Sequence, residues 1–214
     1  MTGTSKTRIL CLDAYDITCE RDDRVLFERL AFQITGGELL KVVGPNGSGK
    51  TTLLRLLAGL NREFSGEVRW KGREIQSVYP EYARERLYQG HTVAVKKPLT
   101  AMENLRWLCA MESPGDEALE AALESVSLAG YEHTPCAQLS AGQQRRVGLA
   151  RLVISQAPLW ILDEPFTALD HAGIAWLEQQ ISHHIGHGGA VVITSHHALT
   201  EVSTQSELVL GGGV

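Results

Sequence analysis

Apolar and polar positions alternate along some stretches of the chain and form nearly unbroken apolar runs along others. Residues 9–20 and 30–35 partly alternate, which is typical of strands with one buried face. Residues 38–43, 159–164 and 190–195 are mostly apolar, as expected of strands that are buried on both faces. Shorter strands are expected at 66–70, 84–88 and 207–210.

A spacing of three to four residues between apolar positions predicts the helices. One begins at Lys50 and ends near Gly59, because glycine is favourable just beyond a helix end. Another begins after Thr100, since Glu103 three residues later completes a capping-box pattern. Further helices are expected at 115–130 and 171–186.

The order of these elements indicates an α/β fold. Apolar strands that alternate with helices favour a mostly parallel central sheet covered on both faces. Helical patterns replace strands over about 92–156, so an inserted helical subdomain is expected there. The core then comprises about 1–91 and 157–214, and the whole chain 1–214 is expected to be a single domain.

Composition narrows the class of protein. The chain has 214 residues, of which 43% are hydrophobic and 21% charged, a balance typical of soluble globular proteins. The formal net charge of -5 disfavours nucleic acid as the main partner. No apolar run approaches the ~18 residues that cross a bilayer, and residues 1–10 lack the apolar centre of a signal peptide. We therefore expect a cytoplasmic protein that can dock on a membrane protein.

The spacing of cysteines and histidines gives little support for a metal site. Reduced, mostly buried thiols are expected, because no C-x-x-C pair occurs among the cysteines Cys11, Cys19, Cys109 and Cys136. His183 and His187 would share a helix face and could hold a metal, with His184 beside them. No cysteine or carboxylate joins them locally, so a surface helix end is the favoured interpretation.

The stretch "GPNGSGKTT" at 44–52 carries the clearest chemistry. It fits G-x-x-x-x-G-K-[ST] at every fixed position and lies between an expected strand and an expected helix. Such a loop surrounds phosphate oxygens with backbone N–H groups, Lys50 faces the β- and γ-phosphates, and the Thr51 hydroxyl is a ligand for Mg²⁺. The expected nucleotide-binding residues of this loop are Gly44, Pro45, Asn46, Gly47, Ser48, Gly49, Lys50, Thr51 and Thr52.

Polar residues at the ends of two buried strands supply candidate catalytic groups. Asp163 is expected to hold Mg²⁺ through water, and Glu164 beside it to polarise the attacking water near the γ-phosphate. His196 follows the strand at 190–195 and so lies on the ligand side of a parallel sheet, where it could donate to the γ-phosphate or hold the water. A structural histidine is the alternative for His196, and its neighbour His197 has no assigned role.

A second helix start, "LSAGQQRRVGLARL" at 139–152, also has features of an anion site. Ser140, Gly142 and Gln143 lie at its expected N-terminus, where backbone N–H groups attract negative charge. This helix start lies far along the chain from the phosphate loop, which raises the question of whose phosphate it contacts.

The segments "GPNGSGKTT", "LSAGQQRR", "WILDEP", "TALD" and "TSH" occur in this order with suitable spacing. Together they resemble an ATP-binding-cassette (ABC) ATPase over the whole chain. The "LSAGQ" signature distinguishes this family from other proteins with the same phosphate loop. The resemblance implies a P-loop NTPase fold with a mostly parallel central sheet, an antiparallel N-terminal β part and the inserted helical subdomain.

The resemblance also implies how the second helix start is used. In the family, two ATPase domains pair head to tail, and the signature of one closes on the ATP held by the other. Ser140, Gly142 and Gln143 would then contact the partner's ATP, and Asp170 in "TALD" would link the two sites. The implied enzyme is a homodimer that hydrolyses ATP with Mg²⁺.

Two positions depart from the family pattern. Arg21 stands where many members carry an aromatic residue that stacks on adenine, and a guanidinium plane stacks on a base as well. His91 replaces the glutamine that usually contacts the metal. Gln89 lies two residues earlier and on a strand would point to the same side, so either His91 or Gln89 is the expected Mg²⁺ contact.

Within the family, segments such as "CERDDRVLFERLAFQITGGELL" and "LTAMENLRWL" resemble the ATPase subunit of cytochrome c maturation transporters, often called haem exporters. This implies integral membrane transporter subunits as partners and a peripheral location on the cytoplasmic face of the bacterial inner membrane, with haem involved only indirectly. The alternatives are the ATPase of another ABC exporter, a soluble ABC ATPase and a P-loop kinase. Soluble members usually carry two cassettes or long coiled-coil insertions, and a kinase would not need the signature helix.

Overall fold

The computed structural model describes residues 11–21, 24–199 and 205–211. Within these ranges, four strands form an antiparallel sheet in the order β2-β1-β4-β5. Their bounds are β1 Cys11–Arg21, β2 Arg24–Thr35, β4 Ser65–Trp70 and β5 Arg73–Glu74. β2 begins earlier than the apolar pattern predicted, because its first half pairs with β1 as a hairpin while much of it faces solvent. The start of the first strand expected at residue 9 lies outside the described residues.

A second sheet, which the described residues build from five strands, is parallel in the order β6-β7-β8-β3-β9. The bounds are β3 Leu39–Val43, β6 Arg86–Gln89, β7 Leu159–Asp163, β8 Ala190–Thr194 and β9 Gln205–Val209. Every residue of β7 and β8 is buried, which is why these strands read as unbroken apolar runs. The predicted combination of a parallel central sheet and an antiparallel N-terminal part is confirmed.

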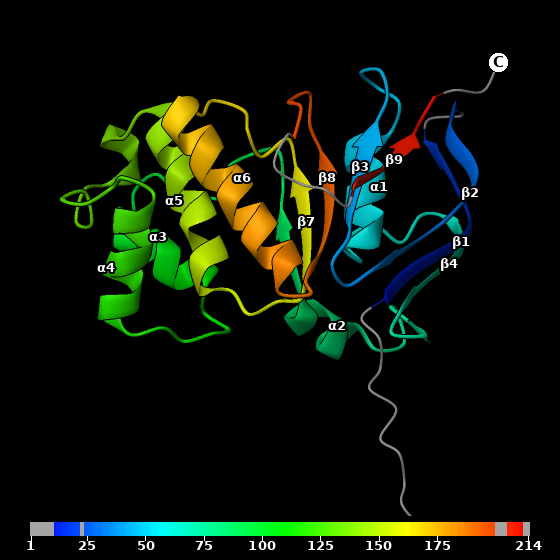
Figure 1. Ribbon diagram of the computed structural model, residues 1–214, viewed down its shortest axis with the longest axis horizontal. Coiled ribbons are helices and arrows are strands. Elements are labelled where there is room, and N and C mark those ends of the chain that lie inside the picture. Colours follow the sequence, from blue (N-terminus) through cyan, green and yellow to red (C-terminus); the bar gives the residue numbers. More distant parts are fainter. Residues whose placement is uncertain (1–10, 22–23, 200–204, 212–214) are drawn as a thin grey trace, which may run out of the picture.

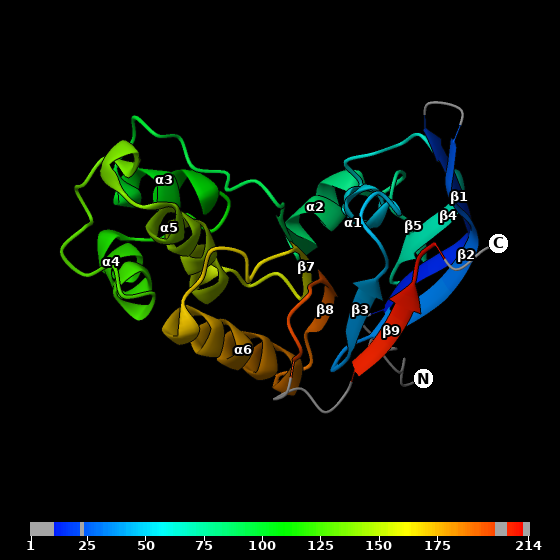
Figure 2. The same ribbon diagram turned by 90° about the horizontal axis from the view of Figure 1, so that it is seen from above.

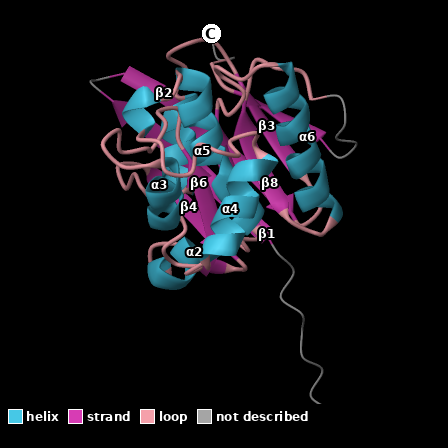
Figure 3. Cartoon of the chain, turned by 90° about the vertical axis from the view of Figure 1, so that its left-hand side faces the viewer, coloured by secondary structure: helices cyan, strands magenta, loops and turns pink. Residues whose placement is uncertain are grey.

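Helices cover both faces of the parallel sheet and form a separate group at one end. The bounds are α1 Lys50–Leu57, α2 Tyr79–Glu85, α3 Ala101–Leu108, α4 Asp116–Ser125, α5 Ala141–Ile154 and α6 His171–Gly186, with a 3-10 turn at Cys136–Gln138. Helices α3, α4 and α5 lie together at the end opposite the antiparallel sheet (Figure 1). Figure 2 shows α6 on one side of the parallel sheet and α1 and α2 on the other. Viewed from the helical end, α4 and α5 lie in front of the strands (Figure 3).

Three buried clusters of the described residues hold these layers together. The strands β7 and β8 of the parallel sheet contribute side chains to two of these clusters, one on each face of the sheet. Ile161 and Val192 face the cluster that α1 and the antiparallel sheet share. Leu162 and Ile193, one residue further along the same strands, face the cluster under α6. This alternation places apolar side chains on both faces of one sheet. The third cluster lies among α3, α4 and α5.

Local signals in the sequence set several helix ends. The predicted capping box of α3 is formed: the Glu103 N–H donates to Thr100 Oγ1 at 3.1 Å, and the Thr100 N–H donates to Glu103 Oε2 at 2.8 Å. Gly59 follows the last turn of α1 with a φ of +69°, a backbone conformation that favours glycine. Helix α2 was not predicted, because it is only seven residues long.

The three histidines near the end of α6 are not all exposed to solvent. His183 and His187 are exposed and their rings lie 4.1 Å apart, as the shared helix face predicted. His184 instead turns inward and stacks on Trp160 at a centroid distance of 3.9 Å. The interpretation of all three histidines as a surface helix end is therefore wrong for His184. Among the residues described, no group of three or more histidine, cysteine or carboxylate side chains is arranged to hold a metal ion.

The four cysteines are free thiols, and Cys19, Cys109 and Cys136 are buried. Burial raises the pKa of the Cys109 thiol to about 12, so it stays protonated and unreactive near neutral pH. In the described part of the chain no helix combines the length and the apolarity that crossing a membrane requires.

Candidate functional site

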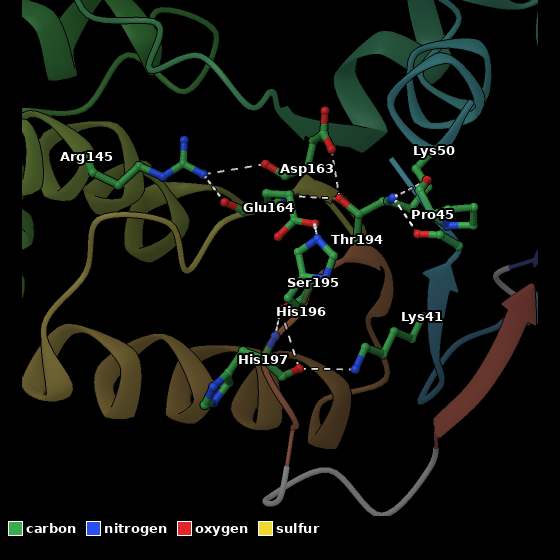
Figure 4. Close-up of polar contacts among 11 residues, drawn as sticks. Lys41, Pro45, Lys50, Arg145, Asp163, Glu164, Thr194, Ser195, His196 and His197 are labelled. Carbon is green, nitrogen blue, oxygen red and sulfur yellow. Dashed lines mark hydrogen bonds and ion pairs between the residues drawn. The ribbon is translucent and has the colours of Figure 1, made fainter. Parts of the chain in front are cut away.

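The phosphate loop connects β3 to α1, as predicted. Gly44 has a φ of +153°, and a Cβ there would lie 2.5 Å from the Leu210 carbonyl oxygen, so only glycine fits where the loop leaves the strand. The Lys50 ammonium donates to the carbonyl oxygens of Gly44 at 2.7 Å and Pro45 at 3.0 Å (Figure 4). Lys50 therefore spans the loop and fixes its curvature. The backbone N–H groups and this cation at the start of α1 suit the binding of an anion.

Asp163 and Glu164 lie at the carboxyl end of β7 and are held by the neighbouring strand β8. Asp163 is almost fully buried, and its Oδ1 accepts a hydrogen bond from Thr194 Oγ1 at 2.7 Å. The Glu164 N–H donates to the same hydroxyl at 2.9 Å (Figure 4). At Glu164 the backbone adopts a φ of +47°, which turns the chain out of the strand direction. One threonine thus orients both acidic residues.

The donor set at this strand end fits Mg²⁺. Asp163 Oδ2 is buried and has no hydrogen-bond partner among the described residues, so an acceptor oxygen is available at the base of the cleft. Thr51, with its hydroxyl, lines the cleft together with Asp163. A carboxylate and a hydroxyl are hard oxygen ligands of the kind that Mg²⁺ takes beside substrate phosphates.

His196 lies at the mouth of the same site. It follows β8, and its Nε2 is 3.6 Å from Glu164 Oε1 (Figure 4). The His196 side chain is 75% exposed whereas that of Glu164 is 17% exposed, so the histidine is open to solvent above a sheltered carboxylate. The two residues expected to act on the γ-phosphate are therefore neighbours.

A cleft of about 420 Å³ joins these groups. The phosphate loop, the acidic end of β7 and His196 line it, and so do Arg21 at the end of β1 and His91 after β6. The loop residues Pro45 and Ser48 instead line an adjoining groove between β2 and β9. Most of the residues predicted from the motifs of the core thus line one cleft, although they come from separate parts of the chain.

Gln89 and His91 do not share a strand face. Strand β6 ends at Gln89, so the alternation used to pair the two residues does not reach His91. Gln89 is buried, and its amide lies close to Gly148 of α5, where a Cβ would be 3.6 Å from Nε2. His91 is the one of the two that lines the cleft.

The signature residues lie at the start of α5 and do not line the cleft of their own chain. Ser140 is the N-cap: its Oγ accepts from the Gln143 N–H at 3.2 Å, and its N–H donates to Gln143 Oε1 at 2.9 Å. A Cβ on Gly142 would lie 2.9 Å from the Ala168 carbonyl oxygen, so this helix start packs tightly on the segment after β7.

Asp170 is the N-cap of α6 and also contacts the signature helix. It accepts from the Gly173 N–H at 2.9 Å and forms an ion pair with Arg146. The Gly173 hydrogen bond and then Arg146 hold the pKa of Asp170 below its usual range, so it stays ionised near neutral pH.

Sequence reasoning missed Arg145, which connects three parts of the site. Its buried guanidinium donates to the carbonyl oxygens of His91 at 2.9 Å and Pro165 at 3.2 Å. It also donates to the carbonyl oxygen of Glu164, the contact drawn in Figure 4. Burial lowers the pKa of Arg145, which the carboxylates of Asp163 and Glu164 partly offset. The signal was its spacing from Leu149 and Leu152, which places this arginine on the apolar face of α5.

Comparison with known proteins identifies the family. The family model described as ABC transporter matches residues 27–167. A cytochrome c biogenesis ATP-binding export protein, CcmA, of Hahella chejuensis is 51% identical over 88% of this chain and 90% of its own length. The protein of the same name from Pseudomonas putida is 52% identical over 94% of this chain and 97% of its own length.

Solved structures agree on the fold. A putative ABC transporter ATP-binding protein from Pyrococcus furiosus has a TM-score of 0.79 and 25% identity, covering 92% of this chain and 97% of that one. An ATP-binding subunit of an ABC transporter has a TM-score of 0.81 over 93% of this chain and 85% of that one. With the phosphate loop, the paired acids and the signature helix in one fold, the chain belongs to the ABC transporter family and is an ATPase.

Proposed function

We propose that this chain is the ATP-hydrolysing subunit of a membrane complex that serves cytochrome c biogenesis or haem export. The observation that carries the proposal is the 52% identity, over 94% of the chain, to a relative named as a cytochrome c biogenesis ATP-binding export protein. The phosphate loop, the paired acids and the signature helix described above support the ATPase part independently of that name. Haem is involved only indirectly, because the proposed role of this chain is the use of ATP.

In this proposal the cleft holds ATP with its phosphates on the loop from Gly44 to Thr52. Lys50 exchanges its carbonyl contacts for phosphate oxygens, and Thr51 and Asp163 would hold Mg²⁺, which would neutralise phosphate charge. Glu164 takes the proton of the attacking water. His196, which lies beside Glu164, donates a hydrogen bond to the γ-phosphate.

Arg21 and His91 complete the proposed nucleotide site. Arg21 lines the cleft and would stack its guanidinium plane on the base. His91 lines the same cleft as Thr51 and Asp163, whereas Gln89 is buried against α5, so His91 is the better candidate for the Mg²⁺ environment.

The proposed functional unit is a homodimer in which each signature faces the partner's nucleotide. Support comes from the exposed Ser140 and from the absence of Ser140, Gly142 and Gln143 from the described lining of their own cleft. Asp170 at the start of α6 would then join the two sites through Arg146 of the signature helix. We place the helical subdomain at about 92–156 within one ABC ATPase domain.

The proposed location is the cytoplasmic face of the bacterial inner membrane, where the chain would bind integral membrane transporter subunits. Deleting the gene in its native host is expected to abolish c-type cytochromes, measured by haem staining of membrane fractions. Purification of the tagged chain from native membranes is expected to recover integral membrane partners. Normal cytochromes together with a defect in some other export process would contradict the cytochrome c role and leave a different ABC exporter. Recovery with no membrane protein would favour a soluble ABC ATPase.

A further inference from the structure

The loop after β8 sends two neighbouring histidines in opposite directions. The His197 N–H donates to Ser195 Oγ at 2.8 Å, which closes a tight turn around residues 195–197. His196 points over the cleft toward Glu164, whereas His197 points back onto α6 (Figure 4). No role was predicted for His197, yet several parts of the structure contact it.

Three separate elements contact His197. Its Nε2 lies 3.0 Å from Oε1 of Glu178 on α6, which is hydrogen-bond distance for a ring N–H that donates to a carboxylate oxygen. The ring packs on Phe166 at a centroid distance of 4.8 Å. The His197 carbonyl oxygen accepts from Lys41 Nζ of β3 at 3.1 Å (Figure 4).

His196, by contrast, has little that holds its own side chain. It is 75% exposed, and its distance of 3.6 Å to Glu164 Oε1 is longer than a hydrogen bond. Its position is therefore set by the backbone, and the backbone is fixed by the contacts of the next residue. Phe166, which packs on His197, lies two residues after Glu164, so His197 supports the chain on both sides of the His196–Glu164 pair.

We propose that His197 is a positioning residue for ATP hydrolysis: it holds His196 over Glu164 by tying the loop after β8 to Glu178, Phe166 and Lys41. His197 does not line the nucleotide cleft, so it acts on the reaction through His196. The inference rests on the proposed roles of His196 and Glu164. It predicts an effect on kcat rather than on the affinity for ATP.

The test uses the full chain, in complex with the membrane proteins that purify with it, and steady-state ATPase measurements. His197→Leu keeps the packing volume but removes the donor to Glu178, and we expect kcat to fall ~10-fold with KM changed by less than ~2-fold, since small misplacements of catalytic groups are costly. His197→Gln retains an amide donor and is expected to restore most of kcat. His183→Leu makes the same change at an exposed histidine of α6 and is the matched control.

A cycle with His196 separates positioning from a merely structural role. In a His196→Ala background, His197→Leu is expected to lower kcat no further, because the residue through which it acts is already gone. A further loss there, or an unchanged kcat with a lowered melting temperature, overturns the proposal. If His196→Ala itself has no effect, the proposed role of His196 fails first and this inference with it.

Glu178→Ala removes the partner of His197 on α6, so it tests the same contact if His197→Leu does not fold. It is expected to reproduce the loss of kcat and to be non-additive with His197→Leu. Full activity of Glu178→Ala contradicts the proposal even without the other variant.

Discussion

Single side chains in the cleft differ sharply in their surroundings even where they are neighbours in sequence. Asp163 is buried and fixed by Thr194, whereas the positive φ of Glu164 turns the next carboxylate toward the cleft. The first is suited to hold a cation and the second to meet a water molecule. Because the two adjacent carboxylates have different surroundings, one strand end can supply two chemical roles.

Replacing Glu164 by Gln is expected to leave ATP binding intact and to lower kcat by about 100-fold or more, the usual cost of removing a general base. The amide keeps the shape but does not take a proton, and it no longer repels the γ-phosphate. An ATP-bound dimer should therefore accumulate, which size-exclusion chromatography with ATP would detect. Lys50→Ala is the contrasting variant and should lose nucleotide affinity. Near-normal turnover of the Gln variant would exclude Glu164 as the base.

Replacing Arg21 by Ala is expected to weaken the binding of ATP and GTP alike, by about 0.5–2 kcal/mol, the range for contacts between a cation and an aromatic ring. Stacking is largely insensitive to which purine is present, and the phosphate loop contacts only phosphates. Titration with fluorescent analogues of both nucleotides measures the two losses. Unchanged affinity would mean that Arg21, although it lines the cleft, does not contact the base.

How much of the site the sequence could predict depends on whether a residue acts locally. The loop from Gly44 to Thr52, Glu164 and Ser140 were predictable because each sits in a contiguous pattern with a fixed relation to a strand or helix end. Thr194 and Arg145 were not, because their partners are carbonyls and carboxylates brought in from other elements. Their importance follows from the fold alone.

At the level of elements, long periodic segments were predictable and short ones were not. Strand β7 and helix α6 were read closely from their apolar patterns, since burial on a fixed face repeats along the element. Helix α2 and the two-residue β5 are too short to show a period. The packing of α6 on β7 also carries a titratable group into the interior, since His184 stacks on Trp160.

The half-buried His184 predicts how the stability of the protein depends on pH. Burial lowers the pKa of His184 from 6.5 to about 4, so between these values the unfolded chain binds a proton that the folded chain does not. The contribution of neutral His184 to the free energy of unfolding is therefore fully present above pH 6.5. It is lost as the pH falls toward 4, which lowers the free energy of unfolding by up to about 3 kcal/mol.

His184→Phe keeps a ring against Trp160 without a titrating nitrogen. The variant is expected to lose less stability than the wild type between pH 7 and pH 5, measured by urea unfolding. His183→Phe, at an exposed position of the same helix, should keep the wild-type slope. An identical slope in all three proteins would show that His184 titrates normally in the folded chain.

At the scale of the whole molecule, the phosphate loop belongs to the core and the signature helix belongs to the helical group at the other end. The loop joins β3 to α1 in the core, whereas α5 packs with α3 and α4 and presents Ser140 away from its own cleft. In this structure the cleft of one chain therefore contains the phosphate loop without the signature residues. A second copy of the chain supplies the missing half in the proposed homodimer.

Mixing two inactive variants tests this arrangement. Lys50→Ala breaks the loop half and Ser140→Arg blocks the signature half, so each homodimer should be nearly inactive. A mixed dimer contains one doubly broken site and one intact site, which joins Lys50 of one copy to Ser140 of the other. ATPase activity should therefore return on mixing. If activity stays at background while crosslinking shows that mixed dimers form, the signature does not complete the partner's site.

The three buried clusters also differ in how they are spread along the chain. All buried members of the cluster around α5 fall between Ala101 and Ala150, whereas the cluster around α1 joins Leu12 to Leu210. Contacts between residues close in sequence cost less chain entropy and form sooner. During synthesis the helical cluster can close while β9 is still inside the ribosome, but Gly44 gains its packing against Leu210 only afterwards. The signature helix is thus expected to gain its packing before the phosphate loop of the same chain does.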